Sequence, residues 1–187
     1  MITATELLWI QSIQQTMASH PVLIPIAIFC ARWAIFLNVP LWMLFYWKKI
    51  GKRHDAMEAC WVFVISLFTA TVISRLTNRP RPFQADPDLI HLYISAPWNA
   101  SYPSGHTSVA FALAFIFLYA NPKWGWVSLV LAILTACGRI AVGVHFPTDI
   151  VAGMVVAFVA FAFVRLIHQQ LFTGRMNKIA RNHRHDG

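Results

Sequence analysis

The chain is poor in charged residues, and this shortage is the first guide to its class. Only 12% of its residues are Asp, Glu, Lys or Arg, whereas a soluble globular domain carries about 25%. Hydrophobic residues make up 58% of the 187 positions. This composition excludes an ordinary water-soluble domain and predicts an all-α integral membrane protein. The length suits a single membrane-embedded domain over residues 1–187.

Acidic residues are scarcer still. The 7 Asp and Glu residues face 15 Lys and Arg residues, which gives a net charge of +8. The basic residues lie mostly at the ends of apolar runs and are not interleaved with exposed aromatic residues. This arrangement is typical of membrane topology signals and argues against nucleic-acid binding. We therefore expect the lipid bilayer and a membrane lipid as partners, and no nucleic acid.

Cysteine is also rare. Cys30, Cys60 and Cys137 each lie inside an apolar run, and none belongs to a CxxC pair. Thiols in such places usually act as small apolar side chains, so we predict neither a disulfide nor a metal site from them. The N-terminal segment lacks the basic start of a secretory signal, and we expect no cleavage there.

Long apolar runs predict a bundle of five transmembrane helices, since a span needs about 20 residues. The segment 3–18 is too polar to cross and is expected to form a short helix in the membrane interface. Arg32 interrupts the first apolar run, and Pro40 is expected to kink it. The predicted spans cover roughly residues 22–47, 56–77, 105–120, 124–142 and 147–171, and residues 172–187 follow as a tail.

Basic residues in the short loops predict how these spans are oriented. The loop 48–53 contains Lys and Arg, Lys123 separates the third span from the fourth, and the tail is again basic. The positive-inside rule places all of them in the cytoplasm. The N-terminus, the connection 78–104 and the turn 143–147 are therefore expected on the outer face of the membrane.

Three polar residues interrupt the apolar pattern in the stretch GRIAVGVHFPTD, at residues 138–149. Arg139, His145 and Asp149 are a cation, an imidazole and a carboxylate, each of which is costly beside lipid. Pro147 fits the first turn of the next helix, which places His145 at a junction between two spans. The predicted topology puts this junction on the outer face.

The stretch YPSGHT, at residues 102–107, reaches the same face. Pro103 and Ser104 are typical of a helix start, where free backbone amides suit an anion. Gly105 lets a phosphate approach the backbone closely, and His106 projects from the first turn. An ordinary helix cap beside an interfacial histidine would explain the same residues.

The stretch RPRPF, at residues 79–83, ends the second span on that face. Arg79 and Arg81 carry guanidinium groups, which suit bidentate contact with phosphate oxygens. Snorkelling toward lipid headgroups is the alternative for both. For Arg32, inside the first span, two explanations stay open: it lines a substrate cavity or it pairs with a partner inside the bundle.

Together these residues supply what transfer of a phosphoryl group without a metal requires. His145 can act as the nucleophile, because Asp149 can hold one ring N–H and leave the other nitrogen free to attack. His106 can protonate the leaving oxygen and then activate water. Two alternatives remain: a metal hydrolase that uses the same three residues as ligands, and an anion or lipid transporter.

The motifs RPRP, PSGH and GRxxxxxHxxxD resemble the three-part signature of the type 2 phosphatidic acid phosphatase (PAP2) superfamily of membrane lipid phosphatases. The resemblance implies a helical bundle, a phosphohistidine intermediate on His145, His106 as the acid, and neither a metal nor another cofactor. It assigns the binding of phosphate to Arg81, Ser104, Gly105 and Arg139.

Some positions depart from the family pattern. A lysine often stands seven residues before the arginine of the first motif; here it is absent and Arg75 is the nearest basic residue. We expect Arg75 and Arg79 as further phosphate ligands. Gly138 replaces a frequent serine. The length and the PRPF ending are similar to those of the short bacterial undecaprenyl pyrophosphate phosphatases, many of which carry Asp where this chain has Gly105.

Short outer loops leave a site at headgroup depth uncovered, which favours a lipid substrate over a soluble ester. The resemblance implies hydrolysis of undecaprenyl pyrophosphate to undecaprenyl phosphate and inorganic phosphate on the outer face of a bacterial inner membrane. This reaction recycles the carrier lipid of cell-wall synthesis. A phosphatase of phosphatidic acid, phosphatidylglycerol phosphate or lipid A is the alternative among lipid phosphatases.

Overall fold

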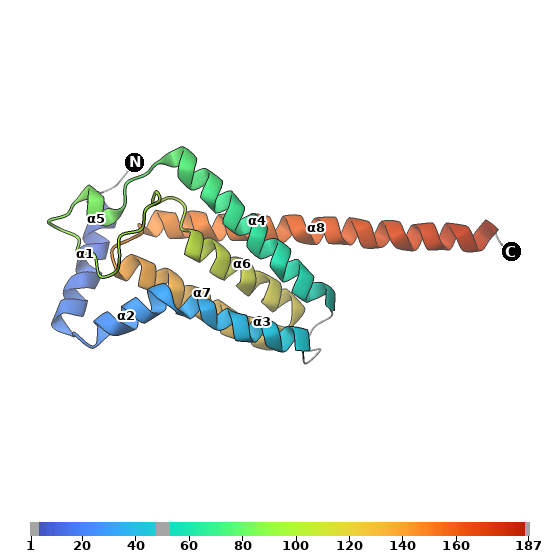
Figure 1. Cartoon of the computed structure of the whole chain (residues 1–187), viewed down its shortest axis with the longest axis horizontal. Coiled ribbons are helices and arrows are strands. Elements are labelled where there is room, and N and C mark those ends of the chain that lie inside the picture. The colour runs from blue at the N-terminus through green and yellow to red at the C-terminus, as the bar shows by residue number, and fades with distance from the viewer. Residues whose placement is uncertain (1–3, 48–52, 186–187) are drawn as a thin grey trace.

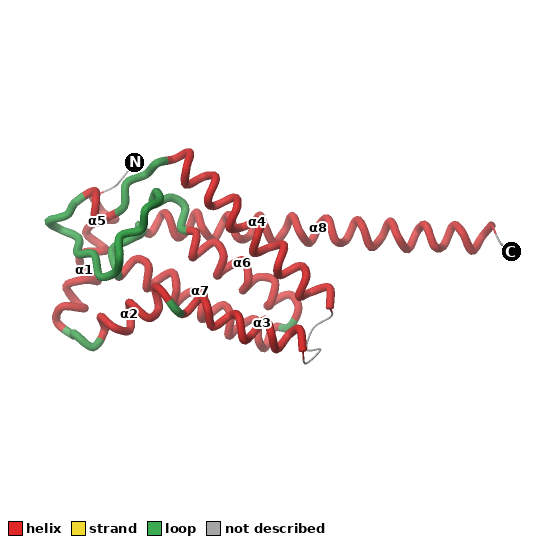
Figure 2. The backbone as a smooth tube through the Cα atoms, viewed as in Figure 1, coloured by secondary structure: helices red, strands yellow, loops and turns green. Residues whose placement is uncertain are grey.

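The computed structural model describes residues 4–47 and 53–185, with side chains over 4–43 and 55–170. Every regular element in this part of the chain is helical (Figures 1 and 2). The elements are α1 (Ala4–Ser19), α2 (Leu23–Arg32), the 3-10 helix η1 (Ala34–Leu37), α3 (Asn38–Trp47), α4 (Arg53–Thr77), α5 (Pro82–Ala85), α6 (Gly105–Ala120), α7 (Pro122–Ala141) and α8 (Pro147–His185).

The helices follow the apolar runs of the sequence closely, which confirms the all-α class. Within the described residues, α4, α7 and α8 are long and apolar enough to cross a membrane, and the α2–α3 segment makes a fourth candidate if it is one broken span. Helix α6 is apolar but has only 16 residues. Three to four spans are thus supported by length and composition, and the count of five stays a prediction.

The bend in the first apolar run does not lie at Pro40, where we expected it. The axes of 23–32 and 34–43 differ by 58° across Trp33, and the chain tightens there into η1. Pro40 lies in the first turn of α3, where a backbone N–H would have no acceptor inside the helix. The proline therefore starts a helix and does not kink one.

Helix α6 is the centre of the bundle and packs against α4, α7 and α8 (Figure 1). Small side chains allow this close packing, and Ala110, Ala112 and Ala114 are completely buried on α6. A Cβ atom at Gly125 of α7 would lie 2.3 Å from the Cα atom of Leu118. The backbones of α6 and α7 can approach this closely only because residue 125 has no side chain.

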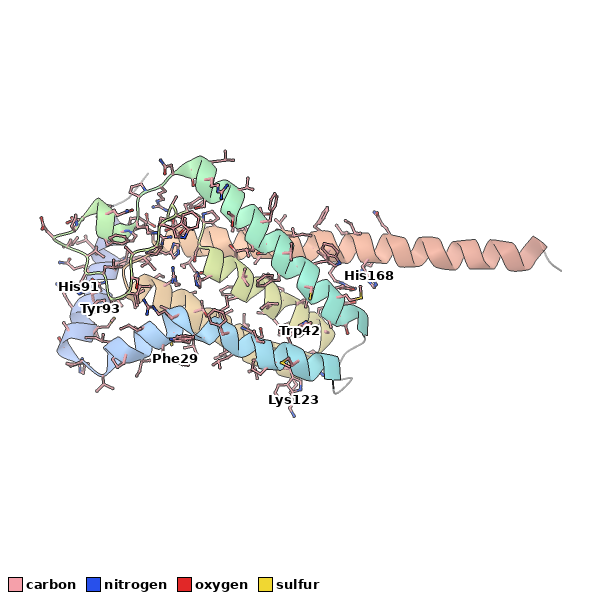
Figure 3. The ribbon with its side chains drawn as sticks, viewed as in Figure 1. Phe29, Trp42, His91, Tyr93, Lys123 and His168 are labelled. Atoms are coloured by element: carbon pink, nitrogen blue, oxygen red, sulfur yellow. The ribbon has the colours of Figure 1, made fainter. Side chains whose placement is uncertain are left out.

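Helix α1 and the connection 86–104 cover one end of the bundle, and α8 extends past the other end (Figures 1 and 2). Gln14 fastens α1 in place, because its Nε2 donates to the carbonyls of His91 at 2.8 Å and Ala141 at 3.1 Å. Lys123 and His168 lie at the end opposite His91 and Tyr93 (Figure 3). The membrane side that each end faces stays a prediction.

Candidate active site

Arg81 is the most extensively bonded side chain at the α1 end of the bundle, and it is almost fully buried. Its Nε and Nη2 donate to the backbone and side-chain oxygens of Asn99 at 2.9 and 2.8 Å. Its Nη1 donates to the carbonyl of Val144 at 2.7 Å and lies 3.4 Å from Nε2 of His145. One guanidinium thus joins the RPRPF stretch to the 97–101 loop and to the turn before α8.

His145 lies in that turn, between the end of α7 and the start of α8, and is buried. Its Nδ1 is 3.5 Å from Oδ2 of Asp149, and its Nε2 faces the guanidinium of Arg81. An acceptor on one side and a donor on the other select the neutral ring with its proton on Nδ1. The lone pair of Nε2 then points toward the guanidinium of Arg81 at the polar end of the site.

Asp149 is completely buried in the first turn of α8. Its Oδ2 accepts hydrogen bonds from Oγ of Ser101 at 2.5 Å and from the backbone N–H of Phe146 at 2.8 Å. Its Oδ1 accepts from Nη1 of Arg79 at 2.5 Å. These partners hold the carboxylate in one orientation beside the imidazole, as a group that orients a catalytic histidine must be held.

A cavity of about 600 Å³, which we call the main cavity, opens beside this pair. Its polar end is lined by Arg81, His106, Arg139 and His145. Its other end runs between η1, α3, α4 and α6 and is largely apolar. The apolar part of the lining consists of Ile35, Phe36, Val39, Phe63, Leu67, Ala70, Val109 and Leu113, with Pro97 and Trp98 from the loop.

Arg139 supplies positive charge to the main cavity with little compensation from protein groups. It is buried, and its Nη1 makes a long hydrogen bond of 3.5 Å to the carbonyl of Ala31. Its Nε has no hydrogen-bond partner among the described residues. A buried cation in this condition needs an anion, so the polar end of the cavity is built to receive one.

The start of α6 contributes a glycine and a histidine to the cavity, but not Ser104. Gly105 and His106 both line it, and a Cβ atom at Gly105 would meet no atom within 4 Å. Ser104 is fully buried and caps α6: its Oγ accepts from Oγ1 of Thr107 at 2.9 Å. The structure thus places Ser104 as a cap outside the cavity lining.

The other candidate arginines lie in three different places. Arg75 lines the main cavity from α4 and is exposed. Arg79 lies behind the site, where it bonds to Asp149 and Glu6 and its guanidinium carbon is 4.3 Å from the centre of the Phe146 ring. Arg32 ends α2 and donates to Oγ of Ser95 at 2.9 Å, outside the cavity lining.

Comparison with known proteins identifies the family. The model of the PAP2 superfamily matches residues 55–173, which include every motif described above. The chain belongs to the PAP2 superfamily. Sequence reasoning therefore identified the family correctly.

Two relatives match most of the chain. It is 33% identical over 149 residues to the undecaprenyl-diphosphatase BcrC of Bacillus subtilis (strain 168), covering 78% of this chain and 76% of that one. It is 30% identical over 164 residues to the putative undecaprenyl-diphosphatase YbjG of Escherichia coli (strain K12), covering 85% and 80%. The crystal structure of Aquifex aeolicus LpxE matches with a TM-score of 0.71 and 23% identity, over 87% and 95% of the two chains. This last likeness supports the fold.

The packing of α2 against α7 explains the glycine at position 138, where the sequence pattern predicted a frequent serine. A Cβ atom at this position would lie 2.5 Å from the backbone nitrogen of Ala31. Helix α2 therefore occupies the space that a serine side chain would need, and Ala31 provides the carbonyl that Arg139 contacts. Position 138 is therefore a point of close contact between two helices.

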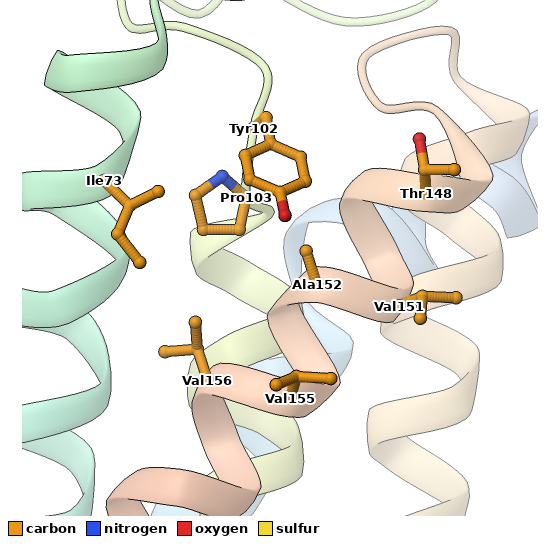
Figure 4. Close-up of a pocket in the computed structure, with 8 residues that line it drawn as sticks. All are labelled: Ile73, Tyr102, Pro103, Thr148, Val151, Ala152, Val155 and Val156. Carbon is orange, nitrogen blue, oxygen red and sulfur yellow. The ribbon is translucent and has the colours of Figure 1, made fainter. Parts of the chain in front are cut away.

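A second groove lies between α4 and α8, beside the segment that leads into α6 (Figure 4). It is lined by Ile73, Tyr102, Pro103, Thr148, Val151, Ala152, Val155 and Val156 (Figure 4). No charged residue lines it. We call it the α4–α8 groove, and its chemistry suits an apolar chain and not a phosphate.

The environment of His145 determines its protonation. Burial, with the charges of Arg139 and Arg81, lowers the pKa of His145 from 6.5 to about 4, against the opposing effect of Asp149. The ring is therefore neutral over the physiological range, as a nucleophilic nitrogen requires. Its pKa rises when an anion is bound beside it.

Sequence reasoning missed several residues that hold this PAP2 site together. Asn99 and Ser101 bond to Arg81 and Asp149 from a loop that the sequence marked only as a connection. Glu6 in α1 is buried against Arg79 and Thr148. The excess of arginines over acids among the motifs was the one signal that such a carboxylate was needed. Among the described residues, no group of three His, Cys, Asp or Glu could hold a metal ion.

Proposed function

We propose that this PAP2 protein is a lipid phosphatase that hydrolyses undecaprenyl pyrophosphate to undecaprenyl phosphate and inorganic phosphate. One observation carries the proposal: the cationic end of the main cavity, at His106 and His145, continues into an apolar groove. A diphosphate joined to a long apolar chain has this same division of polarity. The names of the two relatives point to the same substrate.

In the first step, Nε2 of His145 attacks the terminal phosphorus of the lipid. The bond between this phosphorus and the bridging oxygen breaks, and protonated His106 gives its proton to that oxygen. The imidazole becomes cationic while Nδ1 keeps its proton, and the carboxylate of Asp149, 3.5 Å away, stabilises the charge. Nδ1 has no hydrogen-bond partner among the described residues of the free protein. Catalytic contacts of this kind often shorten once a ligand is bound.

In the second step, water attacks the phosphorus of the phosphohistidine. Neutral His106 takes a proton from this water, the bond from phosphorus to Nε2 breaks, and inorganic phosphate leaves. Each group returns to its starting state. The two histidines line one cavity, which lets the same acid serve as the base of the reverse proton transfer.

Binding of the phosphate is assigned to Arg139, Arg81, Gly105 and Arg75. Arg139 supplies the least compensated charge, and the space at Gly105 lets oxygens approach the amides at the start of α6. Arg75 suits the second phosphate, because it lies at the exposed side of the cavity. Ser104 acts through the cap of α6, and Arg79 acts through Asp149.

The proposed arrangement in the membrane has five spans, with the N-terminus and the site on the outer face of a bacterial inner membrane and the C-terminus inside. The polar end of the main cavity lies at the same end as the loops that the charge pattern assigns to the outside. The lipid can then keep its chain in the bilayer and bring its headgroup to His145. Accessibility of single introduced cysteines from the two sides would test this orientation.

Purified protein tests the reaction directly. In detergent with EDTA, it should release inorganic phosphate from undecaprenyl pyrophosphate, and His145→Ala should reduce the rate at least about a thousandfold. The variant His168→Ala, at the opposite end of the bundle, controls for loss of a histidine as such. Substrate labelled in its terminal phosphate should leave acid-labile label on a peptide that contains His145.

The same assay separates the alternatives. Higher kcat/KM for phosphatidic acid, phosphatidylglycerol phosphate or lipid A would reassign the substrate while keeping the chemistry. Activity lost in EDTA and restored by a divalent ion would replace the phosphohistidine mechanism by a metal-dependent one. Movement of lipid or anion across liposomes without release of phosphate would indicate a transporter.

A further inference from the structure

Glu6 connects the N-terminal helix to the catalytic pair through buried contacts. It is a carboxylate on α1, only 7% exposed. Its Oε2 pairs with Nη2 of Arg79 at 3.0 Å. Its Oε1 accepts from the backbone N–H and the hydroxyl of Thr148 at 3.1 and 2.6 Å. Helix α1 therefore meets the first turn of α8 through charged groups and not only through apolar packing.

Arg79 carries this connection to Asp149. Its Nη1 donates to Oδ1 of the carboxylate at 2.5 Å, while the other oxygen, Oδ2, faces His145. The order in space is carboxylate, guanidinium, carboxylate and imidazole. Arg79 is shared between two anions, so neither Glu6 nor Asp149 alone takes up its whole charge.

We propose that Glu6 and Arg79 are positioning residues for the attack by His145. Glu6 neutralises part of the charge of Arg79, so that the carboxylate of Asp149 can still stabilise the imidazolium. The inference rests on the proposed function, because it assigns roles around the same histidine. It makes α1 part of the active site. Without Glu6, the guanidinium of Arg79 would bind Asp149 alone and would oppose the positive charge that forms on the ring.

Charged and titratable groups face His145 from four neighbouring parts of the chain. They are Arg81 before α5, His106 on α6, Arg139 on α7 and Asp149 on α8. Glu6 and Arg79 form a further pair behind Asp149. Removing one member of this pair changes the local charge by one unit, and the sign depends on which member is removed. A purely mechanical support would have no such sign.

Single and paired variants test this sign in the intact protein. Glu6→Gln should lower kcat roughly tenfold with little change in KM. It should also move the acid limb of the pH profile of kcat/KM to lower pH. Arg79→Gln should move that limb to higher pH, and the double variant should bring it back toward the wild-type position. Arg79→Lys keeps the charge and should keep the limb. Undecaprenyl pyrophosphate is the substrate throughout, so its own ionisation cancels between variants.

The matched control is Glu58→Gln at the opposite end. Glu58 is also buried and paired, with Nη1 of Arg165 at 2.8 Å. Its replacement should lower Tm without moving the acid limb.

Two outcomes would overturn the inference. One is a shift of the acid limb in the same direction in Glu6→Gln and Arg79→Gln, and the other is a lower Tm with an unmoved acid limb, as in Glu58→Gln. If Glu6→Gln does not fold, the two Arg79 variants decide. An acid limb that moves in Arg79→Gln but not in Arg79→Lys supports the inference, and the same acid limb in both variants overturns it. Absence of phosphate release by the wild type would refute the proposed function itself.

Discussion

Nη1 of Arg81 lies 3.4 Å from Nε2 of His145 and donates at 2.7 Å to the carbonyl of Val144. One guanidinium therefore supports both the ring that is expected to attack and the backbone that carries this ring. The remaining nitrogens of Arg81, Nε and Nη2, donate hydrogen bonds to Asn99 and Ala100. Arg81 organises the site as well as supplying charge to it.

Arg81→Lys should consequently damage both the fold and the reaction. Lysine has no planar fork and cannot reach the carbonyls of both loops, so buried acceptors lose their donors. We expect a loss of about 2–4 kcal/mol in the free energy of unfolding and of at least about a hundredfold in kcat/KM. Arg75→Lys, in the same cavity but exposed, should keep Tm. Equal Tm for the two variants would contradict this role.

The low pKa of His145 gives a second prediction. Burial holds this pKa at about 4, so the neutral ring persists as the pH falls through 6.5 and is lost only near the lower value. The unfolded chain binds the proton first, so stability should decrease as the pH falls from about 6.5 toward 4. NMR titration of protein labelled at histidine carbons measures the pKa, with His145→Ala to assign the signal. A midpoint at or above 6.5 in the free protein would contradict it.

The sequence was sufficient to predict candidate catalytic groups but not the residues that support them. His106, Arg139, His145 and Asp149 could be found because polar residues are costly in an apolar chain and the topology brings them to one end. The contacts of Glu6 and Asn99 could not be found. A polar residue in a short interfacial helix or a loop is expected to face water, and only the fold shows that these two face buried arginines.

The fold was predictable to a similar degree. Apolar length located the helices, and α6 was predicted at its observed bounds. The bend at Trp33 was missed, because no proline or glycine stands there to mark it in the sequence. Ser104 was assigned to phosphate from its motif. Its position as a buried cap depends on the first turn of α6, which bonds its hydroxyl to Thr107.

Two glycines in the motifs should differ in how much their substitution destabilises the protein. Gly138→Ser places a side chain against the backbone of Ala31 at 2.5 Å and should cost about 1–3 kcal/mol of stability. Gly105→Ser has open space around its Cβ and should leave Tm nearly unchanged, with any effect confined to kcat/KM. Thermal unfolding in one detergent compares the two. Greater destabilisation by Gly105→Ser would show that the α2–α7 contact is not the reason for Gly138.

The apolar end of the main cavity should determine chain-length preference. Leu67 on α4 lines it, and Leu67→Trp fills space that a prenyl chain needs while leaving the polar end intact. We expect kcat/KM for undecaprenyl pyrophosphate to fall at least about tenfold, and that for a five-carbon prenyl pyrophosphate to stay within about twofold.

Val155→Trp provides the matched control, because Val155 lines the α4–α8 groove (Figure 4). It adds the same bulk to the other apolar surface near the site and should change neither substrate's kcat/KM. A larger loss for Val155→Trp with the long substrate would move the prenyl chain to the α4–α8 groove. Equal losses for the long and short substrates in Leu67→Trp would indicate that the substitution disturbs His145 or its partners and not the binding of the chain.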